Sequence, residues 1–260
     1  MIRLALQDRL VPGATIAERA DRARRYGFDA IELSLPPVVD HAREALRHGT
    51  SVSALCGGYR GWLIDPDPAL VALARADLHE QLAVAGELGA ACIVVPIWGR
   101  TRNLPGIATG RTSADDAALF VEGLRELAVT AERTGATLVI EPLNRYQNDV
   151  CNTITDALRF RGLAGSPAVK VMGDTFHMNM EEADMAAAIE SAGDLLGYVH
   201  LADNQRLEPG RGHIDFTALL TALARIRYEG YVSLELLRLS READEALPAA
   251  AAFLRERLAP

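Results

Sequence analysis

The sequence predicts an α/β fold, a single (βα)8 TIM barrel, on three observations. Strand-like and helix-like segments alternate eight times along the chain. The length of 260 residues suits one such barrel, which typically takes about 250 residues. No low-complexity linker or block of like charges divides the sequence. We therefore expect one domain over residues 1–260.

The predicted strands are short apolar runs near 2–6, 29–33, 51–56, 91–97, 136–141, 169–173, 197–201 and 231–235. The predicted helices lie between them, near 15–26, 38–48, 68–88, 114–134, 153–163, 181–192, 215–226 and 241–257. Each strand and its helix together take roughly the length of one βα unit, about 30 residues. The competing doubly wound open sheet would normally carry a GxGxxG loop after the first strand, and this sequence has none there.

Several boundaries carry typical helix signals. Asp67 is a candidate N-cap before Pro68, and Thr112 precedes a helix with Asp115 in its first turn. Asp215 is a candidate N-cap of the next-to-last helix. Glycines stand where three helices should end, at Gly27, Gly89 and Gly135.

The charge balance argues against a nucleic-acid partner. The formal net charge is −8, with 27 Lys and Arg against 35 Asp and Glu. Tight binding to a phosphate backbone requires clustered Lys and Arg. The basic stretch at Arg22, Arg24 and Arg25 lies in a helical pattern and is typical of a solvated face.

Three cysteines without a CxxC pair do not suggest a disulfide framework, so a reducing cytoplasm is expected. The first ten residues carry charge at Arg3, Asp8 and Arg9, unlike a signal peptide. No apolar run approaches the roughly 20 residues that cross a bilayer, so no membrane partner is expected.

Four chemistry-bearing residues close or follow successive predicted strands: Glu141, Asp174, His200 and Glu235. In a parallel barrel these strand ends converge on one face, where active sites are built. Three carboxylates would repel one another there unless a divalent cation lay among them. Oxygen ligands with one imidazole favour Mn²⁺, Mg²⁺ or Co²⁺ over a metal that prefers thiolates.

A cation with two Glu ligands suggests a mechanism. The metal would chelate a substrate carbonyl and the neighbouring hydroxyl, and one Glu would remove the intervening C–H proton to form a cis-enediolate. Proton return to the other face of the same carbon is epimerisation. Return to the neighbouring carbon is aldose–ketose isomerisation.

Other residues are candidates for contact with a substrate. Long connections after the third and fourth strands carry Tyr59, Trp62 and Trp98, which are expected to stack against a sugar or shield it from water. His177 follows Asp174 by three residues and is either a substrate contact or a packed histidine. Glu32, on the second strand, is either a supporting residue or a substrate contact.

The loop after His200 carries two further candidates. Arg206 is expected to clamp a hydroxyl or an anionic group. His213 is interpreted as a hydrogen-bonding loop residue in preference to a ligand of a second metal.

Three segments, IEPLNRYQNDVCNT, MGDTFHMNMEEAD and VHLADNQRLEPGRGHIDF, resemble the xylose-isomerase-like TIM barrels. Within that superfamily they are most similar to ketose 3-epimerases of the D-tagatose and D-psicose (allulose) type. The resemblance implies a metal-dependent isomerase with one ion, usually Mn²⁺, and a homodimer or homotetramer. It also implies a small sugar or keto-sugar as substrate.

The resemblance assigns roles to six positions. It implies that Glu141 and Glu235 are both metal ligands and the acid/base pair. It implies that Asp174 and His200 complete the metal site, and that His177 and Arg206 contact substrate oxygens.

One position departs from the family pattern. The epimerases typically have a Glu at the position of Gln147, where it helps to bind the substrate. Gln carries no charge and donates as well as accepts, so an altered substrate is one interpretation. The chain is also short for this group, which suggests trimmed loops.

Other functions on the same scaffold remain open at this point. They are a hydroxypyruvate-type isomerase, a keto-inositol dehydratase or isomerase, and a sugar-acid decarboxylase. An endonuclease IV-like repair enzyme is more remote, because Cys56-Gly57-Gly58 and Pro96-Ile97-Trp98 end the third and fourth strands without the His ligands of its zinc cluster. A non-catalytic sugar-binding barrel is disfavoured because all four ligand candidates are present.

Overall fold

The structure, a computed structural model, describes residues 1–99 and 109–258. Eight parallel strands form a closed barrel in chain order, with β1 paired to both β2 and β8. They are β1 Arg3–Gln7, β2 Ala30–Leu33, β3 Val52–Cys56, β4 Ala91–Val94, β5 Thr137–Ile140, β6 Val169–Asp174, β7 Leu196–Leu201 and β8 Tyr231–Leu234. The predicted (βα)8 TIM barrel is confirmed.

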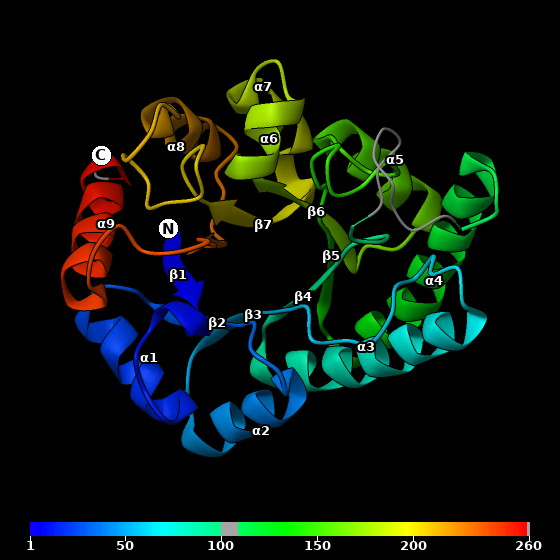
Figure 1. The fold of residues 1–260 in the computed structure, drawn as a ribbon, viewed down its shortest axis with the longest axis horizontal. Helices are drawn as coiled ribbons and strands as arrows, with labels where there is room; N and C mark the ends of the chain where they lie inside the picture. Colours follow the sequence, from blue (N-terminus) through cyan, green and yellow to red (C-terminus); the bar gives the residue numbers. More distant parts are fainter. Residues whose placement is uncertain (100–108, 259–260) are drawn as a thin grey trace.

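The helices follow one another around the outside of the strands, as Figure 1 shows in a view along the shortest axis. They are α1 Ile16–Arg25, α2 Val38–His48, α3 Pro68–Leu88, α4 Ser113–Thr134, α5 Ile154–Ala164, α6 Thr175–Glu181, α7 Met185–Ala192, α8 Phe216–Arg225 and α9 Ala243–Leu258. Short 3-10 helices follow β1 at Asp8–Leu10 and precede β7 at Gly193–Leu195. No helix within 1–99 or 109–258 is long and apolar enough to cross a membrane.

Local capping explains most of the boundaries. The Asp67 side chain accepts from Ala69 N at the start of α3, and Thr112 forms a capping box with Asp115 at the start of α4. Gly89 and Gly135 end these helices in the left-handed conformation. These predicted caps are confirmed.

Two predicted boundaries differ from the structure. The run 91–97 leaves the sheet at Val94, and Pro96 lacks the N–H needed to continue the ladder. One helix was expected near 181–192, but two are present, α6 and α7. The first begins directly after β6 because the Asp174 side chain accepts from Phe176 N at 2.7 Å and His177 N at 3.4 Å. His177 therefore lies on a helix.

The apolar core has two parts. A small cluster lies inside the barrel and is formed by Ala54, Ala91, Ile93, Val139, Met172 and Tyr198. A larger cluster packs the outer faces of the strands against the helices. Because the small cluster occupies only part of the barrel interior, polar side chains occupy positions inside the barrel near the strand ends, where Glu32, Asp174 and His200 are all buried.

The contact between α3 and α4 predicts a large local effect on stability. A Cβ added at Gly86 would lie 2.3 Å from the Thr134 carbonyl oxygen and 2.8 Å from Thr134 Cβ. The variant Gly86→Ala must separate the two helices, and we expect the free energy of unfolding to fall by about 1–3 kcal/mol. Urea denaturation measures it. The matched control is Gly162→Ala in α5, where a Cβ meets no described atom within 4 Å, and equal stabilities of the two variants would contradict the prediction.

Candidate active site

Four side chains from consecutive βα units converge at the C-terminal ends of the strands. Glu141 follows β5, Asp174 ends β6, His200 lies in β7 and Glu235 follows β8. Each offers one ligand atom, and these atoms all lie within 4.8 Å of one another. Asp174 and His200 are directly paired in the sheet register, and Glu235 N donates to Leu201 O at 3.2 Å. The barrel register brings together the four residues that the sequence analysis singled out.

His200 lies in the middle of this cluster. Its Nδ1 is 3.4 Å from Glu141 Oε1, 3.3 Å from Glu235 Oε2 and 3.8 Å from Asp174 Oδ2. This Nδ1 is buried and has no hydrogen-bond partner among the described residues. An imidazole nitrogen facing three carboxylates is the ligand set of a divalent cation, so these residues fit a metal.

The electrostatics also favour a cation. Burial raises the pKa of Glu141, and it raises the pKa of Asp174 to about 7. The pKa of His200 is raised well above its ordinary value, because the carboxylates of Glu32 and Glu235 outweigh the effect of burial. Arg206 and His200 hold the pKa of Glu235 well below its usual range, although burial opposes them. The cluster therefore concentrates negative charge that positive groups must balance.

Arg206 lies beside this cluster. Its guanidinium contacts the Glu235 carboxylate, lies 3.3 Å from Asp174 Oδ2 and stacks over the Phe176 ring at 4.4 Å. Its backbone has φ 61°, a left-handed conformation that is uncommon for a residue other than glycine. Such a conformation persists only where the surrounding structure holds it.

The buried carboxylate of Asp203 provides that support. It accepts from four backbone N–H groups of the loop after β7, those of Asn204, Gly210, Gly212 and Ile214, at 2.7–3.2 Å. The Asp203 carbonyl also accepts from Arg206 N at 2.8 Å. The loop shape that presents Arg206 is therefore set by a residue outside the cluster.

His177 is held in one tautomer by its neighbours. Its Nδ1 accepts from Asn144 N at 3.1 Å and lies 2.7 Å from Asn144 Nδ2. Burial lowers the pKa of His177 to about 4, so the ring is neutral near pH 7. The Asn144 backbone amide at Nδ1 then places the ring proton on Nε2, which lies 3.6 Å from Asp174 Oδ2 and 3.4 Å from Arg206 Nη1. His177 thus offers one N–H donor at the cavity wall.

A cavity of about 470 Å³ opens above the cluster. Of the four converging residues, Glu141 and Glu235 line it, whereas Asp174 and His200 are 1% and 0% exposed and lie beneath. Its wall also contains six of the residues predicted to contact substrate: Tyr59, Trp62, Trp98, Gln147, His177 and Arg206. Trp62 packs edge to face against Tyr59, with ring centroids 5.6 Å apart.

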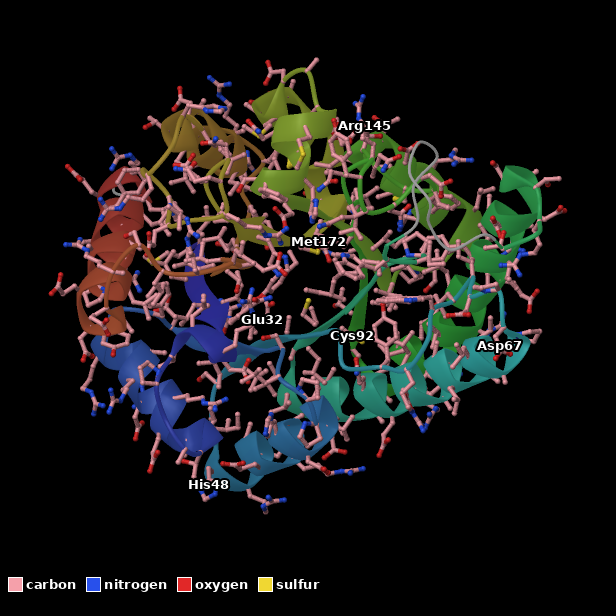
Figure 2. The ribbon with its side chains drawn as sticks, viewed as in Figure 1. Glu32, His48, Asp67, Cys92, Arg145 and Met172 are labelled. Carbon is pink, nitrogen blue, oxygen red and sulfur yellow. The ribbon has the colours of Figure 1, made fainter. Side chains whose placement is uncertain are left out.

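Two further predicted residues, Glu32 and His213, also lie outside the described cavity wall. Glu32 is fully buried and bonded to His200, Tyr198 and Gln7. Figure 2 shows Glu32 inside the ring of strands, whereas His48 lies on the outer edge of α2. This placement agrees with the supporting role that was one interpretation of Glu32. His213 is exposed in its loop, with Nε2 3.2 Å from Asn179 Oδ1, as expected for a hydrogen-bonding loop residue.

The sequence analysis missed several residues of the site. Gln7 is buried at the end of β1, and Arg9 and Cys56 line the cavity. Gln7 carried the same signal as the four converging residues, a polar side chain closing a strand. Asn144 and Asp203 follow β5 and β7, and their roles depend on contacts that the sequence does not reveal.

The fold, with buried acids beneath a cavity at the strand ends, defines a TIM-barrel enzyme. A family model described as "Xylose isomerase-like TIM barrel" matches residues 20–257. The chain belongs to this family, and the resemblance stated from its motifs is confirmed.

Its relatives are named as sugar epimerases. The 3-dehydro-D-guloside 4-epimerase of Escherichia coli (strain K12) is 35% identical over 240 residues, which cover 90% of this chain and 92% of the relative. The D-psicose 3-epimerase of Agrobacterium fabrum (strain C58) is 43% identical over 226 residues, or 83% and 77% of the two chains. The apo crystal structure of 3-keto-D-glucoside 4-epimerase, YcjR, from E. coli superimposes with a TM-score of 0.92 at 33% identity, covering 98% of this chain and 100% of that one. The chain is an enzyme of the isomerase class.

Proposed function

We propose that this protein is a divalent-metal-dependent epimerase, which inverts the hydroxyl-bearing carbon next to the ketone of a keto-sugar. One observation carries the proposal. Of four converging ligand-type residues, Glu141 and Glu235 reach the cavity, while Asp174 and His200 lie beneath it. Two carboxylates at the cavity floor are what a two-base inversion requires.

The proposed cation would be held by Glu141, Asp174, His200 Nδ1 and Glu235. Three oxygen ligands and one imidazole favour Mn²⁺, with Mg²⁺ or Co²⁺ accepted. When bound, the cation withdraws charge from the substrate ketone and its neighbouring hydroxyl, which acidifies the C–H bond between them.

The two glutamates move the proton. One carboxylate removes it from the hydroxyl-bearing carbon and leaves an enediolate. The other glutamate, in its protonated form, donates a proton to the opposite face of that carbon, and the configuration is inverted. Return of the proton to the former carbonyl carbon would instead move the carbonyl group to the neighbouring carbon, an isomerisation that uses the same groups.

The remaining cavity residues orient the sugar. The Nε2–H of His177 and the guanidinium of Arg206 are donors for substrate oxygens beside the reacting carbons. Gln147 offers an uncharged donor and acceptor, and Tyr59 and Trp98 offer apolar ring surface. Glu32 supports His200 in this proposal and does not contact the substrate.

The lengths over which the relatives align with this chain favour a keto-glycoside as substrate. The 4-epimerase aligns with 90% of this chain and 92% of its own length, against 83% and 77% for the 3-epimerase of A. fabrum. Because the 3-epimerase aligns over a smaller share of both chains, ketose 3-epimerisation is the second candidate function. Both reactions exchange the proton on a carbon next to a ketone, so the same two glutamates serve either. We also propose a homodimer or homotetramer of this chain, which sedimentation velocity would test.

Proton exchange followed by NMR tests the proposal. The Mg²⁺-loaded protein is incubated in D₂O with a 3-keto-glucoside, D-fructose, D-tagatose, L-ribulose and hydroxypyruvate in separate samples. We expect metal-dependent deuterium uptake next to the ketone of the 3-keto-glucoside, together with its epimer. Uptake with free ketoses alone would favour the second candidate. Turnover of hydroxypyruvate alone, or no uptake by a metal-loaded protein, would overturn the proposal in favour of another reaction on this scaffold.

A further inference from the structure

We propose that Glu32 is a positioning residue of the metal centre, which holds His200 in the tautomer that leaves Nδ1 free to bind the cation. The proposal rests on the proposed metal-dependent function and extends it to a network beneath the cavity. That network consists of Gln7, Glu32, Ser53 and Tyr198, whose side chains are at most 2% exposed.

Hydrogen bonds fix the orientation of the imidazole. Glu32 Oε2 lies 2.9 Å from His200 Nε2, and a carboxylate can only accept, so His200 donates through Nε2. A neutral imidazole with its proton on Nε2 has a lone pair on Nδ1. That Nδ1 is the buried atom without a hydrogen-bond partner among the described residues, and it faces the three carboxylates.

Tyr198 bonds the same carboxylate oxygen, and Ser53 contacts Tyr198. Tyr198 OH donates to Glu32 Oε2 at 2.9 Å, and Ser53 Oγ lies 2.7 Å from Tyr198 OH. The Ser53 hydroxyl also lies 3.2 Å from the Ile31 carbonyl oxygen, and its single proton can be donated either to that oxygen or to Tyr198. The register between β2 and β3 passes from Ile31 opposite Val52 to Glu32 opposite Ala54, which leaves Ser53 as an extra residue in β3. Such bulges redirect side chains, and this one accompanies the contact of Ser53 with Tyr198 inside the barrel.

Gln7 connects Glu32 to a second ligand. Arg9 Nε donates to Gln7 Oε1 at 2.7 Å, which assigns the amide and directs Gln7 Nε2 toward the carboxylates. Gln7 Nε2 lies 2.8 Å from Glu32 Oε1 and 3.2 Å from Glu235 Oε1. Glu32 is therefore bonded directly to one proposed ligand and through Gln7 to another.

A second metal is the competing interpretation of these residues. Ligand atoms of Glu32, Cys56 and His200 also lie within 4.8 Å of one another. Both Glu32 oxygens, however, already accept hydrogen bonds, from Gln7 on one side and from Tyr198 and His200 on the other. A cation there would break these bonds and displace the His200 proton, so the geometry favours a positioning role.

The variant Glu32→Gln tests the proposal through metal affinity rather than activity. Isothermal titration of the metal-free protein with Mn²⁺ gives the dissociation constant for wild type and variant. We expect the variant to bind Mn²⁺ about 10- to 100-fold more weakly, as for other residues that orient metal-binding histidines. The matched control is Asp116→Asn in α4, which removes another fully buried carboxylate, one that pairs with Arg111. We expect the control to lose thermal stability and keep its Mn²⁺ affinity.

The outcomes separate the two proposals. A wild-type protein that binds no Mn²⁺ would overturn the proposed function. Mn²⁺ binding by wild type with an affinity unchanged in Glu32→Gln would overturn the positioning role alone. Where Glu32→Gln does not fold, Tyr198→Phe replaces it, since it removes one hydroxyl donor and keeps the ring. We expect Tyr198→Phe to bind Mn²⁺ more weakly than wild type, and an unchanged affinity would overturn the proposal.

The tautomer of His200 provides an independent measurement. A long-range ¹H–¹⁵N spectrum of the Mg²⁺-saturated protein reports which imidazole nitrogen carries the proton. A proton on Nε2 of His200 is expected, whereas a proton on Nδ1 would overturn the positioning role.

Discussion

Replacing either Glu141 or Glu235 with Gln is expected to lower kcat for epimerisation by at least about 10³-fold, since general acid–base groups contribute 10²–10⁴-fold and each is also a proposed ligand. A glutamine side chain neither removes nor returns a proton near neutral pH. The other two converging residues, Asp174 and His200, do not line the described cavity wall, so neither can take over the role of a missing glutamate. Initial rates of epimer formation under metal saturation provide the measurement.

The two variants should also differ from each other in isotope exchange. Inversion needs both glutamates, but proton removal from a given epimer needs only the one facing its C–H bond. Each single variant is therefore expected to exchange solvent deuterium into one epimer, at a reduced rate, without converting it to the other. The two variants should act on opposite epimers. Exchange of both epimers by both variants would contradict the two-base assignment.

A control separates this effect from a general loss of charge. Glu126→Gln changes an exposed carboxylate of α4 that pairs with Arg75, outside the cavity. We expect this variant to keep the wild-type rate. An inversion rate above one tenth of wild type in either cavity variant would contradict the assignment.

Removal of the metal is expected to abolish turnover, with recovery on addition of Mn²⁺. Without a cation, the cluster holds buried carboxylates whose repulsion raises the pKa of Asp174 in addition to the effect of burial. Binding should therefore also stabilise the fold. At a free Mn²⁺ concentration 100 times the dissociation constant, the gain is about 2.7 kcal/mol. This corresponds to a rise in Tm of roughly 5–10 °C for a chain of this size.

Differential scanning fluorimetry of chelator-treated protein with and without Mn²⁺ measures this shift. The variant Asp174→Asn is the control, because it removes one proposed ligand that does not line the described cavity wall. We expect its Tm to respond much less to Mn²⁺. Full activity of the chelator-treated enzyme, or an equal Tm shift in Asp174→Asn, would contradict the proposed metal centre.

The barrel was predictable because its signals are local. Alternating apolar strands and capped helices recur along the chain, and caps such as Asp67 and Thr112 depend only on residues within one turn. The misplaced boundary at α6 has a local cause too. Asp174 both ends a strand and caps the following helix, so the helix begins without an intervening loop.

The four converging residues were predictable for a related reason. Each closes or follows a strand, and successive βα units carry the C-terminal ends of all strands to one face. A polar residue in that position is visible in the sequence before the fold is known. The same signal was present at Gln7 and was not used.

What the sequence by itself determined was the barrel and the group of side chains at its mouth. The tertiary structure alone decided which carboxylates reach the cavity and which residues hold them. Glu32 and His200 are 168 residues apart, and Tyr198 and Ser53 are 145 apart. Their contacts depend on barrel closure and on a one-residue register shift between β2 and β3. Strand periodicity predicts which residues face inward, but it does not specify which inward residues of distant strands meet at the same level.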